Sequence, residues 1–381
     1  MNPQIKQAKS QWDTARHQIL QNYAPADPIF TYGNLESSKD FNAATHSHNV
    51  TESFQFPGEA LLQADQAKRT AEIARLSYLA AMRDLRANVE TAYYQVLLDH
   101  ALIAVNAENI DSLKQVLEVT QIRYTASQAA QTDSIAAQLA LSQAELLQHQ
   151  YETNLLNDET ALNQFLYRKP ASPLNLEKTI HLHPLDFPLN KAVAMAISMR
   201  QEILETALTE KNSTTALTLA KMEYLPNYTL AYEFDYILQP GAQPLPHVTQ
   251  AHTFAIGFNL PVFFWIHQRE DVTAAEHSLQ AARYGLDLVR SQTEANVNQL
   301  YQSALFAYAS AQRYDEALIP MARQGFKVSL VAYQTGKIDF LTLSSMLQNS
   351  YATRITYLQN VNQFLAGRVA LEQAIGAPIP Q

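Results

Sequence analysis

A carboxylate lies next to each of two places where long helical sequence reverses direction. Asp133 follows a predicted turn at residues 125–131, and Asp339 follows a second predicted turn at residues 334–337. In an assembly of several chains around one axis, copies of Asp133 would form a ring that attracts cations and repels anions. An ordinary helix-start carboxylate is the alternative for Asp133, and a helix N-cap is the stronger alternative for Asp339. Both residues are candidates for an ion-selective gate.

The residues that flank the two turns are candidates for contacts with a partner protein, or for bonds between helices that hold this end shut. Packing is the competing explanation for the two tyrosines among them. Gly336 supplies the permissive backbone that a sharp reversal needs. The flanking residues are Tyr124, Ser127, Gln128, Tyr333, Gly336 and Lys337.

Two segments alternate between apolar and polar residues, as two-faced strands do. Residues 227–236 place an aromatic residue or leucine at every even position, and residues 250–260 repeat the pattern. A tilted strand that crosses a bilayer around an aqueous lumen requires about ten such residues. Glu233 and Asp235 fall on the polar face and are expected to line the lumen, with placement in a loop as the alternative. The expected lipid-facing residues are Tyr228, Leu230, Tyr232, Phe234, Phe254, Ile256 and Phe258.

Two histidine pairs invite a metal interpretation, because imidazole suits Zn, Cu and Ni. They are His46-x-His48 and His181-x-His183. Both pairs fall in a predicted loop or linker without a nearby carboxylate cluster. Solvated histidines are therefore favoured, and no metal site is assigned.

The composition excludes several classes of function. Only 9 of 381 residues are Gly, which favours long helices, and the net charge of −9 argues against a nucleic-acid surface. Zero Cys excludes disulfides and thiolate sites. The sequence has no phosphate-binding glycine loop, no HExxH and no nucleophile elbow, so neither a catalytic residue nor a cofactor is expected. No apolar run reaches the roughly 18 residues of a spanning helix, so we expect any membrane crossing to use strands.

The two halves of the chain resemble each other. Ala87-Asn88-Val89 with Tyr93 matches Ala295-Asn296-Val297 with Tyr301. We expect a tandem duplication, with one repeat at 1–169, a linker at 170–190 and a second repeat at 191–381. Each repeat is predicted to hold a first helix, two strands, a very long helix, a turn and a second long helix.

The sequence also predicts where the hairpin loops lie and where one long helix is interrupted. The hairpin loops are predicted at residues 34–48 and 239–247, and Phe54 and Phe56 are assigned to the second strand. In the second repeat, the very long helix is predicted at residues 266–333, with a kink or break near Pro320 and Gly325.

Four strands cannot close a barrel, and open edges in hydrocarbon leave backbone groups unpaired. Three copies would supply about twelve strands and six pairs of long helices. The expected fold is therefore mainly α with a small β part, in a homotrimer whose long helices form an α-barrel and whose strands form a transmembrane β-barrel.

Several local patterns lie along nearly the whole chain: Asn2-Pro3, Tyr124-x-x-Ser127 with Asp133, Tyr333-x-x-Gly336 with Thr342, and Leu371-x-x-x-Ile375-Gly376-x-Pro378. Two more patterns border the first pair of predicted strands: Asp27-Pro28 and Phe54-Gln55-Phe56-Pro57-Gly58. In this order, the patterns resemble the TolC-like outer membrane efflux family, and the last two are similar to its CzcC-like heavy-metal branch. In the family's turn motifs, Ser127 replaces a usual glycine, and Thr342 stands where the second motif usually has Asp. Thr342 is therefore a further gate candidate.

The resemblance implies a passive exit duct in the outer membrane of a Gram-negative bacterium, extending into the periplasm. It implies a trimer, a periplasmic adaptor protein docked at the helical-turn end, and an inner-membrane resistance-nodulation-division pump that expels heavy-metal cations. A duct for drug efflux or type I secretion, and a cytosolic coiled-coil scaffold, remain alternatives. Met1-Asn2-Pro3 opens into helical sequence without the pattern of a secretory signal, so we expect the signal to have been removed or the chain to stay in the cytoplasm.

Overall fold

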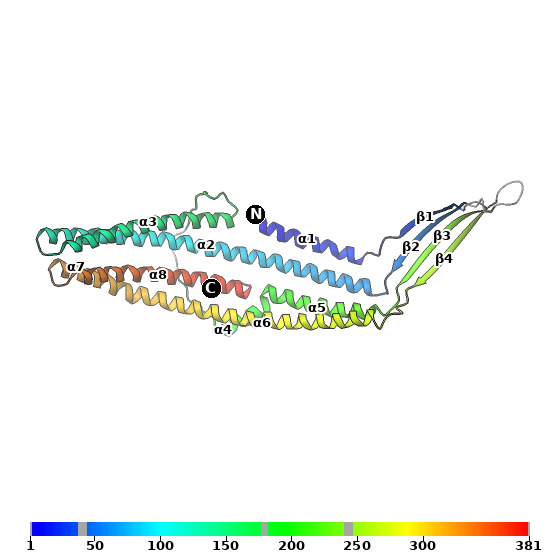
Figure 1. Cartoon of the computed structure of the whole chain (residues 1–381). Coiled ribbons are helices and arrows are strands. Elements are labelled where there is room, and N and C mark those ends of the chain that lie inside the picture. Colours follow the sequence, from blue (N-terminus) through cyan, green and yellow to red (C-terminus); the bar gives the residue numbers. More distant parts are fainter. Residues whose placement is uncertain (1, 37–43, 177–181, 240–246, 380–381) are drawn as a thin grey trace. The chain divides into compact units, whose positions relative to one another are not determined.

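The computed structural model describes residues 2–36, 44–176, 182–239 and 247–379. Most of them are helical (Figure 1). The elements are α1 (Pro3–Tyr23), β1 (Ile29–Glu36), β2 (Ala44–Phe54), α2 (Glu59–Thr125), α3 (Gln131–Phe165), α4 (Leu189–Met199), α5 (Gln201–Met222), β3 (Tyr228–Gln239), β4 (His247–Phe258), α6 (His267–Arg313), a π-helical turn (Tyr314–Leu318), α7 (Ile319–Gln334) and α8 (Phe340–Ile375). The predicted fold class, mainly α with four strands, is confirmed.

The chain forms two compact units, each built from both halves of the sequence. The helical unit comprises Met1–Gln7, Leu79–Gln201 and Arg290–Gln381. The sheet-bearing unit comprises Ala8–Tyr78 and Glu202–Val289. Within the described residues, no helix combines the length and the apolar character that crossing a membrane requires.

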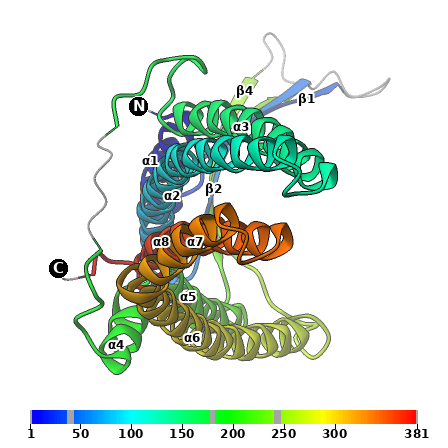
Figure 2. The same ribbon diagram turned by 90° about the vertical axis from the view of Figure 1, so that its left-hand side faces the viewer.

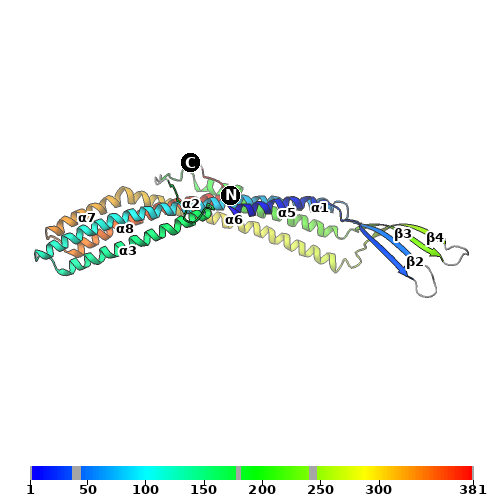
Figure 3. The same cartoon turned by 90° about the horizontal axis from the view of Figure 1, so that it is seen from above.

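The sheet-bearing unit holds one antiparallel sheet in the order β1-β2-β3-β4 (Figure 1), and Figure 3 shows β2, β3 and β4 of this sheet from above. The register pairs Phe30 with Val50, Val50 with Tyr232, and Tyr232 with Phe254, so these side chains share one face. Because side chains alternate along a strand, Glu233 lies on the opposite face with its neighbours Asn49 and Thr253. The sheet is thus two-faced, as the alternation in the sequence predicts.

The ends of the first hairpin differ from the sequence prediction. β2 begins at Ala44, so His46 and His48 lie in a strand and not in the predicted loop. The polar residues here favoured a loop in the prediction. In the structure, β2 pairs with β1 on one side and with β3 on the other, and this pairing stabilises the strand in spite of its polar composition. Phe56 lies beyond the end of β2, where its N–H donates to Asn227 Oδ1 at 2.9 Å. The next residue is Pro57, which cannot donate to a ladder.

The helical unit packs long helices in antiparallel pairs, α2 with α3 and α7 with α8 (Figure 2). One apolar cluster joins both pairs near their turns, with Val116 from α2, Ala137 from α3, Tyr333 from α7 and Leu343 from α8 all buried. A second cluster packs α4 against α6 and α8. These contacts fix the positions of the two turns within the unit.

Between α6 and α7 the helical winding changes, at the place where a break was predicted. A π-helical turn at Tyr314–Leu318 separates α6 from α7, and Pro320 lies in the first turn of α7. The Ile319 N–H donates to Tyr314 O, five residues back, so the helix continues through the π-helical turn. This turn interrupts the usual i→i−4 pattern next to a proline that has no N–H to donate. Gly325 lies inside α7 and breaks nothing.

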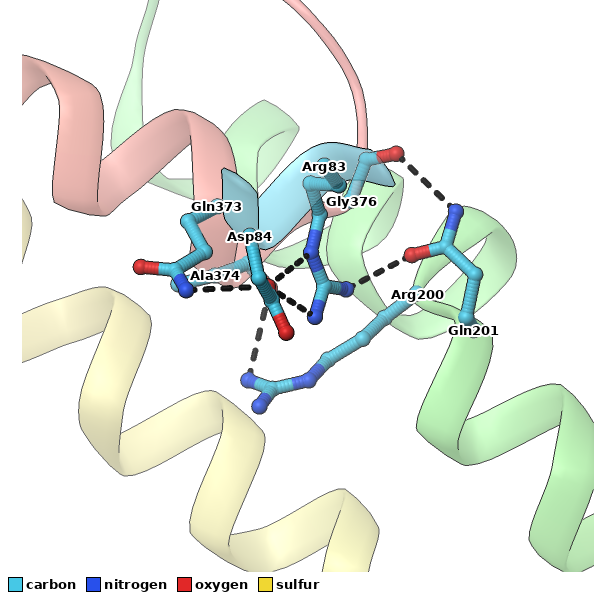
Figure 4. A network of polar contacts seen from close by, with 7 residues as sticks. All are labelled: Arg83, Asp84, Arg200, Gln201, Gln373, Ala374 and Gly376. Atoms are coloured by element: carbon cyan, nitrogen blue, oxygen red, sulfur yellow. Dashed lines mark hydrogen bonds and ion pairs between the residues drawn. The ribbon is translucent and has the colours of Figure 1, made fainter. Parts of the chain in front are cut away.

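Polar contacts join α2, the start of α5 and the end of α8 within the helical unit (Figure 4). Asp84 Oδ1 accepts from Arg83 Nη2 at 2.8 Å and from Gln373 Nε2 at 2.9 Å. Arg83 Nη1 in turn donates to Gln201 Oε1 at 2.6 Å. Gly376 ends α8 in the left-handed conformation at φ +82°, and a Cβ there would lie 2.8 Å from the Arg200 Cα. Only glycine suits both the backbone angle and the close approach.

The predicted linker at 170–190 has no regular helix or strand in its described parts before α4 begins at Leu189. It is nevertheless anchored. Asn163 Nδ2 donates to the carbonyl oxygens of Pro170 and Ser172, and Tyr301 Oη donates to that of Phe187 at 2.7 Å. His181 lies outside the described residues, so the structure does not describe the second histidine pair as a pair.

Candidate functional site

The two turns between the long helices have the same backbone pattern. In the first turn, Gln128 N–H donates to Arg123 O at 2.8 Å, and in the second, Lys337 N–H donates to Ala332 O at 2.8 Å. Each pattern needs one residue at positive φ. Gly336 supplies it in the second turn at φ 74°, and Ser127 supplies it in the first at φ 58°. Ser127 therefore takes up the backbone conformation of the glycine that it replaces.

Tyr333 is the buried centre of this end of the helical unit, with 2% of its surface exposed. Its hydroxyl donates to Asp133 Oδ2 at 3.0 Å, which joins the end of α7 to the start of α3. Burial, followed by the hydrogen bond to Asp133, raises the pKa of Tyr333 to about 12. The phenol therefore stays protonated, and remains a donor, throughout the physiological pH range.

Arg123 is a third member of this network, and the sequence analysis missed it. Its guanidinium carbon lies 4.4 Å from the centroid of the Tyr333 ring, a cation–π contact. Its Nη1 donates to Tyr333 O in the second turn, and its Nη2 donates to Gln128 O at 3.0 Å in the first. One guanidinium thus bonds both turns. Its position one residue before the Tyr124-x-x-Ser127 motif was the available signal.

The other turn candidates are more exposed than Tyr333. Tyr124 keeps 44% of its surface exposed, although it occupies the matching position of the first motif. Ser127, Gln128 and Lys337 are exposed as well, and their side chains are accessible to a partner. The two tyrosines therefore differ: packing accounts for Tyr333 and not for Tyr124.

Asp339 and Thr342 interact with each other. Asp339 is the N-cap of α8 and accepts from the Thr342 N–H at 2.9 Å. Hydrogen bonds from Thr342 lower the pKa of the Asp339 carboxyl. An N-cap carboxylate also faces the positive end of the helix dipole. The geometry thus gives Asp339 a capping role and leaves Thr342 exposed beside it.

The two faces of the sheet differ strongly in chemistry. The face of Tyr228, Leu230, Tyr232 and Phe234 continues onto β4, where Phe254, Ile256 and Phe258 expose 82%, 66% and 63% of their surfaces. His46 and His48 share this face.

The opposite face is small and polar. It carries Glu233 and Asp235 in β3, beside Thr253 and Ala251 of β4. Asp235 Oδ1 is buried and has no hydrogen-bond partner within the described residues. This face resembles the wall of a water-filled space in its residue types.

Comparisons with known proteins match the fold over nearly the whole chain. The family model "Outer membrane efflux protein" matches residues 1–166 and 192–377. A curated relative, the cobalt-zinc-cadmium resistance protein CzcC of Cupriavidus metallidurans, is 19% identical over 98% of this chain and 87% of its own length.

Two solved structures show the same fold. The outer membrane protein VceC of Vibrio cholerae superposes with a TM-score of 0.84 at 15% identity, covering 100% of this chain and 94% of VceC. CusC gives 0.84 at 14% identity, covering 99% and 89%. The chain therefore belongs to the outer membrane efflux protein family, and it is an efflux channel of the outer membrane of a Gram-negative bacterium.

Proposed function

We propose that three copies of this chain form a passive duct for divalent heavy-metal cations, which an inner-membrane resistance-nodulation-division pump expels through a periplasmic adaptor. The observation that carries the proposal is the two-faced sheet with open edges. β1 and β4 each lack a second neighbour among the described strands. In hydrocarbon, each unpaired backbone N–H or C=O group costs roughly several kcal/mol. Neighbouring copies must therefore supply strands that pair with these two edges.

The assignment of the cargo is supported by charge and by the similarity to CzcC. In a trimer, Glu233 and Asp235 would place six carboxylates, two from each chain, around the lumen. Rings of carboxylates favour cations over anions. CzcC is described as a cobalt-zinc-cadmium resistance protein, and this chain covers 87% of its length.

In the helical unit, the two turns are the proposed gate and adaptor contact. Asp133 and Tyr333 bond α3 to α7 there, and Arg123 bonds to both turns. Bonds of this kind hold one of two arrangements of packed helices, and a partner that binds the turns can favour the other. Tyr124, Gln128 and Lys337 are the proposed adaptor contacts.

Growth of a deletion strain tests the cargo. Loss of the chain should increase sensitivity to Co²⁺, Zn²⁺ or Cd²⁺, and the wild-type gene should restore resistance. Increased sensitivity to hydrophobic drugs alone would indicate drug efflux in place of metal export.

Chemical cross-linking in isolated outer membranes tests the oligomeric state. It should give a trimer, and detection of the monomer alone would contradict the proposed closure of the barrel by neighbouring copies.

Reconstituted channels test the gate. Asp133→Lys should reduce the preference for cations, whereas Asp133→Asn should reduce it less, because the lysine reverses the charge and the asparagine only removes it. If both variants kept the conductance and cation preference of the wild type, Asp133 would not belong to the gate.

A further inference from the structure

The β3–β4 hairpin joins α5 to α6 (Figure 1). A carboxylate, an imidazole and a second carboxylate meet at this junction. They belong to Glu223, directly after α5, and to His267 and Asp271 in the first turns of α6. One ligand atom of each lies within 4.8 Å of the others. All three residues lie in the sheet-bearing unit.

The base of the hairpin holds these two helix ends together. Asn259 N–H donates to Asn227 O at 3.2 Å, just outside the last strand pair, Tyr228 with Phe258. The Tyr224 and Phe264 rings lie 6.3 Å apart. The approach of Glu223 to α6 is therefore set by backbone pairing and ring packing, not by the carboxylate itself.

His267 and Asp271 are spaced for chelation. Residues four apart on a helix lie on one face, one turn apart. His267 Nδ1 lies 2.8 Å from Asp271 Oδ2. When the imidazole is protonated, the two groups form an i, i+4 ion pair. A divalent cation would take the place of that proton, with the neutral imidazole and the carboxylate as its ligands.

Three carboxylates lie near this junction. Glu59 is 8% exposed at the start of α2, and burial, followed by the charge of Glu223, raises its pKa. Among the described residues, Asp271 forms its ion pair with His267, and no lysine or arginine forms an ion pair with Glu59, Glu223 or Asp271. A bound cation would offset the charge of these carboxylates.

We propose that Glu223, His267 and Asp271 bind a divalent transition-metal cation of the Zn²⁺ class, which clamps the end of α5 to the start of α6. One imidazole nitrogen and two carboxylate oxygens suit Zn²⁺, Co²⁺ and Ni²⁺ better than Mg²⁺ or Ca²⁺, which prefer oxygen ligands alone. Zn–ligand distances of roughly 2.0–2.2 Å place tetrahedral ligand atoms about 3.4 Å apart. Binding therefore requires small side-chain rotations, in which His267 Nδ1 and Asp271 Oδ2 separate from their distance of 2.8 Å. Three protein ligands leave a coordination position for water.

This site is a structural one, and it goes beyond the proposed transport of cations. A duct needs no tight site for its cargo, whereas a clamp must hold its ion. Failure of either proposal leaves the other intact, because the metal resistance of a strain reports transport and the binding of Zn²⁺ to purified protein reports the clamp.

Calorimetric titration of the purified full chain with Zn²⁺, after treatment with a chelator, tests the proposal. The wild type should bind about one ion per chain, and His267→Ala or Glu223→Gln should weaken binding at least about tenfold. His277→Ala is the matched control, since His277 is exposed on the same helix and should not matter.

Replacement by Co²⁺ provides a second readout. The wild type and His277→Ala should show the visible absorption of protein-bound Co²⁺, and His267→Ala should lose it. Absence of Zn²⁺ binding in the wild type, wild-type affinity in both His267→Ala and Glu223→Gln, or equal weakening in His277→Ala would each overturn the proposal.

Discussion

Removing one hydroxyl tests whether the network at the turns holds the channel closed. Tyr333→Phe deletes the bond of 3.0 Å to Asp133 Oδ2 and keeps the ring that fills the apolar cluster and contacts Arg123. A hydrogen bond to a charged group contributes about 1.5–3 kcal/mol. If the bond exists only in the closed arrangement, its loss shifts the equilibrium toward the open one by about 10- to 150-fold per chain.

Conductance of single channels in planar bilayers measures this shift. Tyr333→Phe should open more often than the wild type, and it should do so at both pH 6 and pH 9, because the raised pKa of about 12 keeps the phenol of the wild type protonated at both. Tyr124→Phe is the matched control. Tyr124 occupies the corresponding position of the first motif and is exposed.

A Tyr333→Phe channel that opens no more often than the wild type, while Asp133→Asn opens readily, would contradict a closing role of the Tyr333 hydroxyl. The carboxylate would then act through another partner. Equal opening of Tyr333→Phe and Tyr124→Phe would also refute it, because an exposed hydroxyl makes no such bond between the helices.

Four further changes have definite expected effects on stability. Burial and the neighbouring Asp158 raise the pKa of Asp99 to about 7. Between about pH 4 and 7, the folded state therefore binds more protons than the unfolded state. Its free energy of unfolding falls as the pH rises through that window. Asp99→Asn should remove this loss and raise the free energy of unfolding at pH 8 by roughly 2–4 kcal/mol, with little gain at pH 4; equal gains at both pH values would contradict it. Ser127→Gly should stabilise the first turn by about 1 kcal/mol, because it relieves a positive φ of 58°, and an unchanged denaturation midpoint would show that no strain exists there. Gly376→Ala should destabilise the folded chain by about 1–3 kcal/mol, because the added Cβ would lie 2.8 Å from a backbone atom. Gly285→Ala has open space around the added Cβ and should stabilise α6 by about 0.5–1 kcal/mol in the same assay.

The sequence predicted the faces of the strands better than their ends. Alternation identified the aromatic face of β3, because one side must be apolar wherever it is buried or meets lipid. β2 extends to Ala44 through polar residues that read as a loop. Its neighbours on both sides supply hydrogen bonds that no local pattern reveals.

The candidate site was predictable where it follows a turn motif. Asp133 and Tyr333 were found from their spacing, and the bond between them is a geometric fact that spacing alone does not give. Arg123 resembles any other charged residue of a long helix, and only the approach of the second turn gives it a distinct role. Glu223 and His267 are 44 positions apart in the chain and meet only because a hairpin closes between them.

The π-helical turn at Tyr314–Leu318 keeps two apolar stripes in phase with two different neighbours. Before it, α6 buries Ala304 and Ala311, seven residues apart, against α8. After it, α7 buries Tyr333, which follows Ala311 by 22 residues, one more than three heptads. The wider turn absorbs that one residue. An uninterrupted α-helix would rotate Tyr333 by about 100° away from Asp133. The π-helical turn, some fifteen residues before Tyr333, therefore determines whether the Tyr333 hydroxyl can reach Asp133.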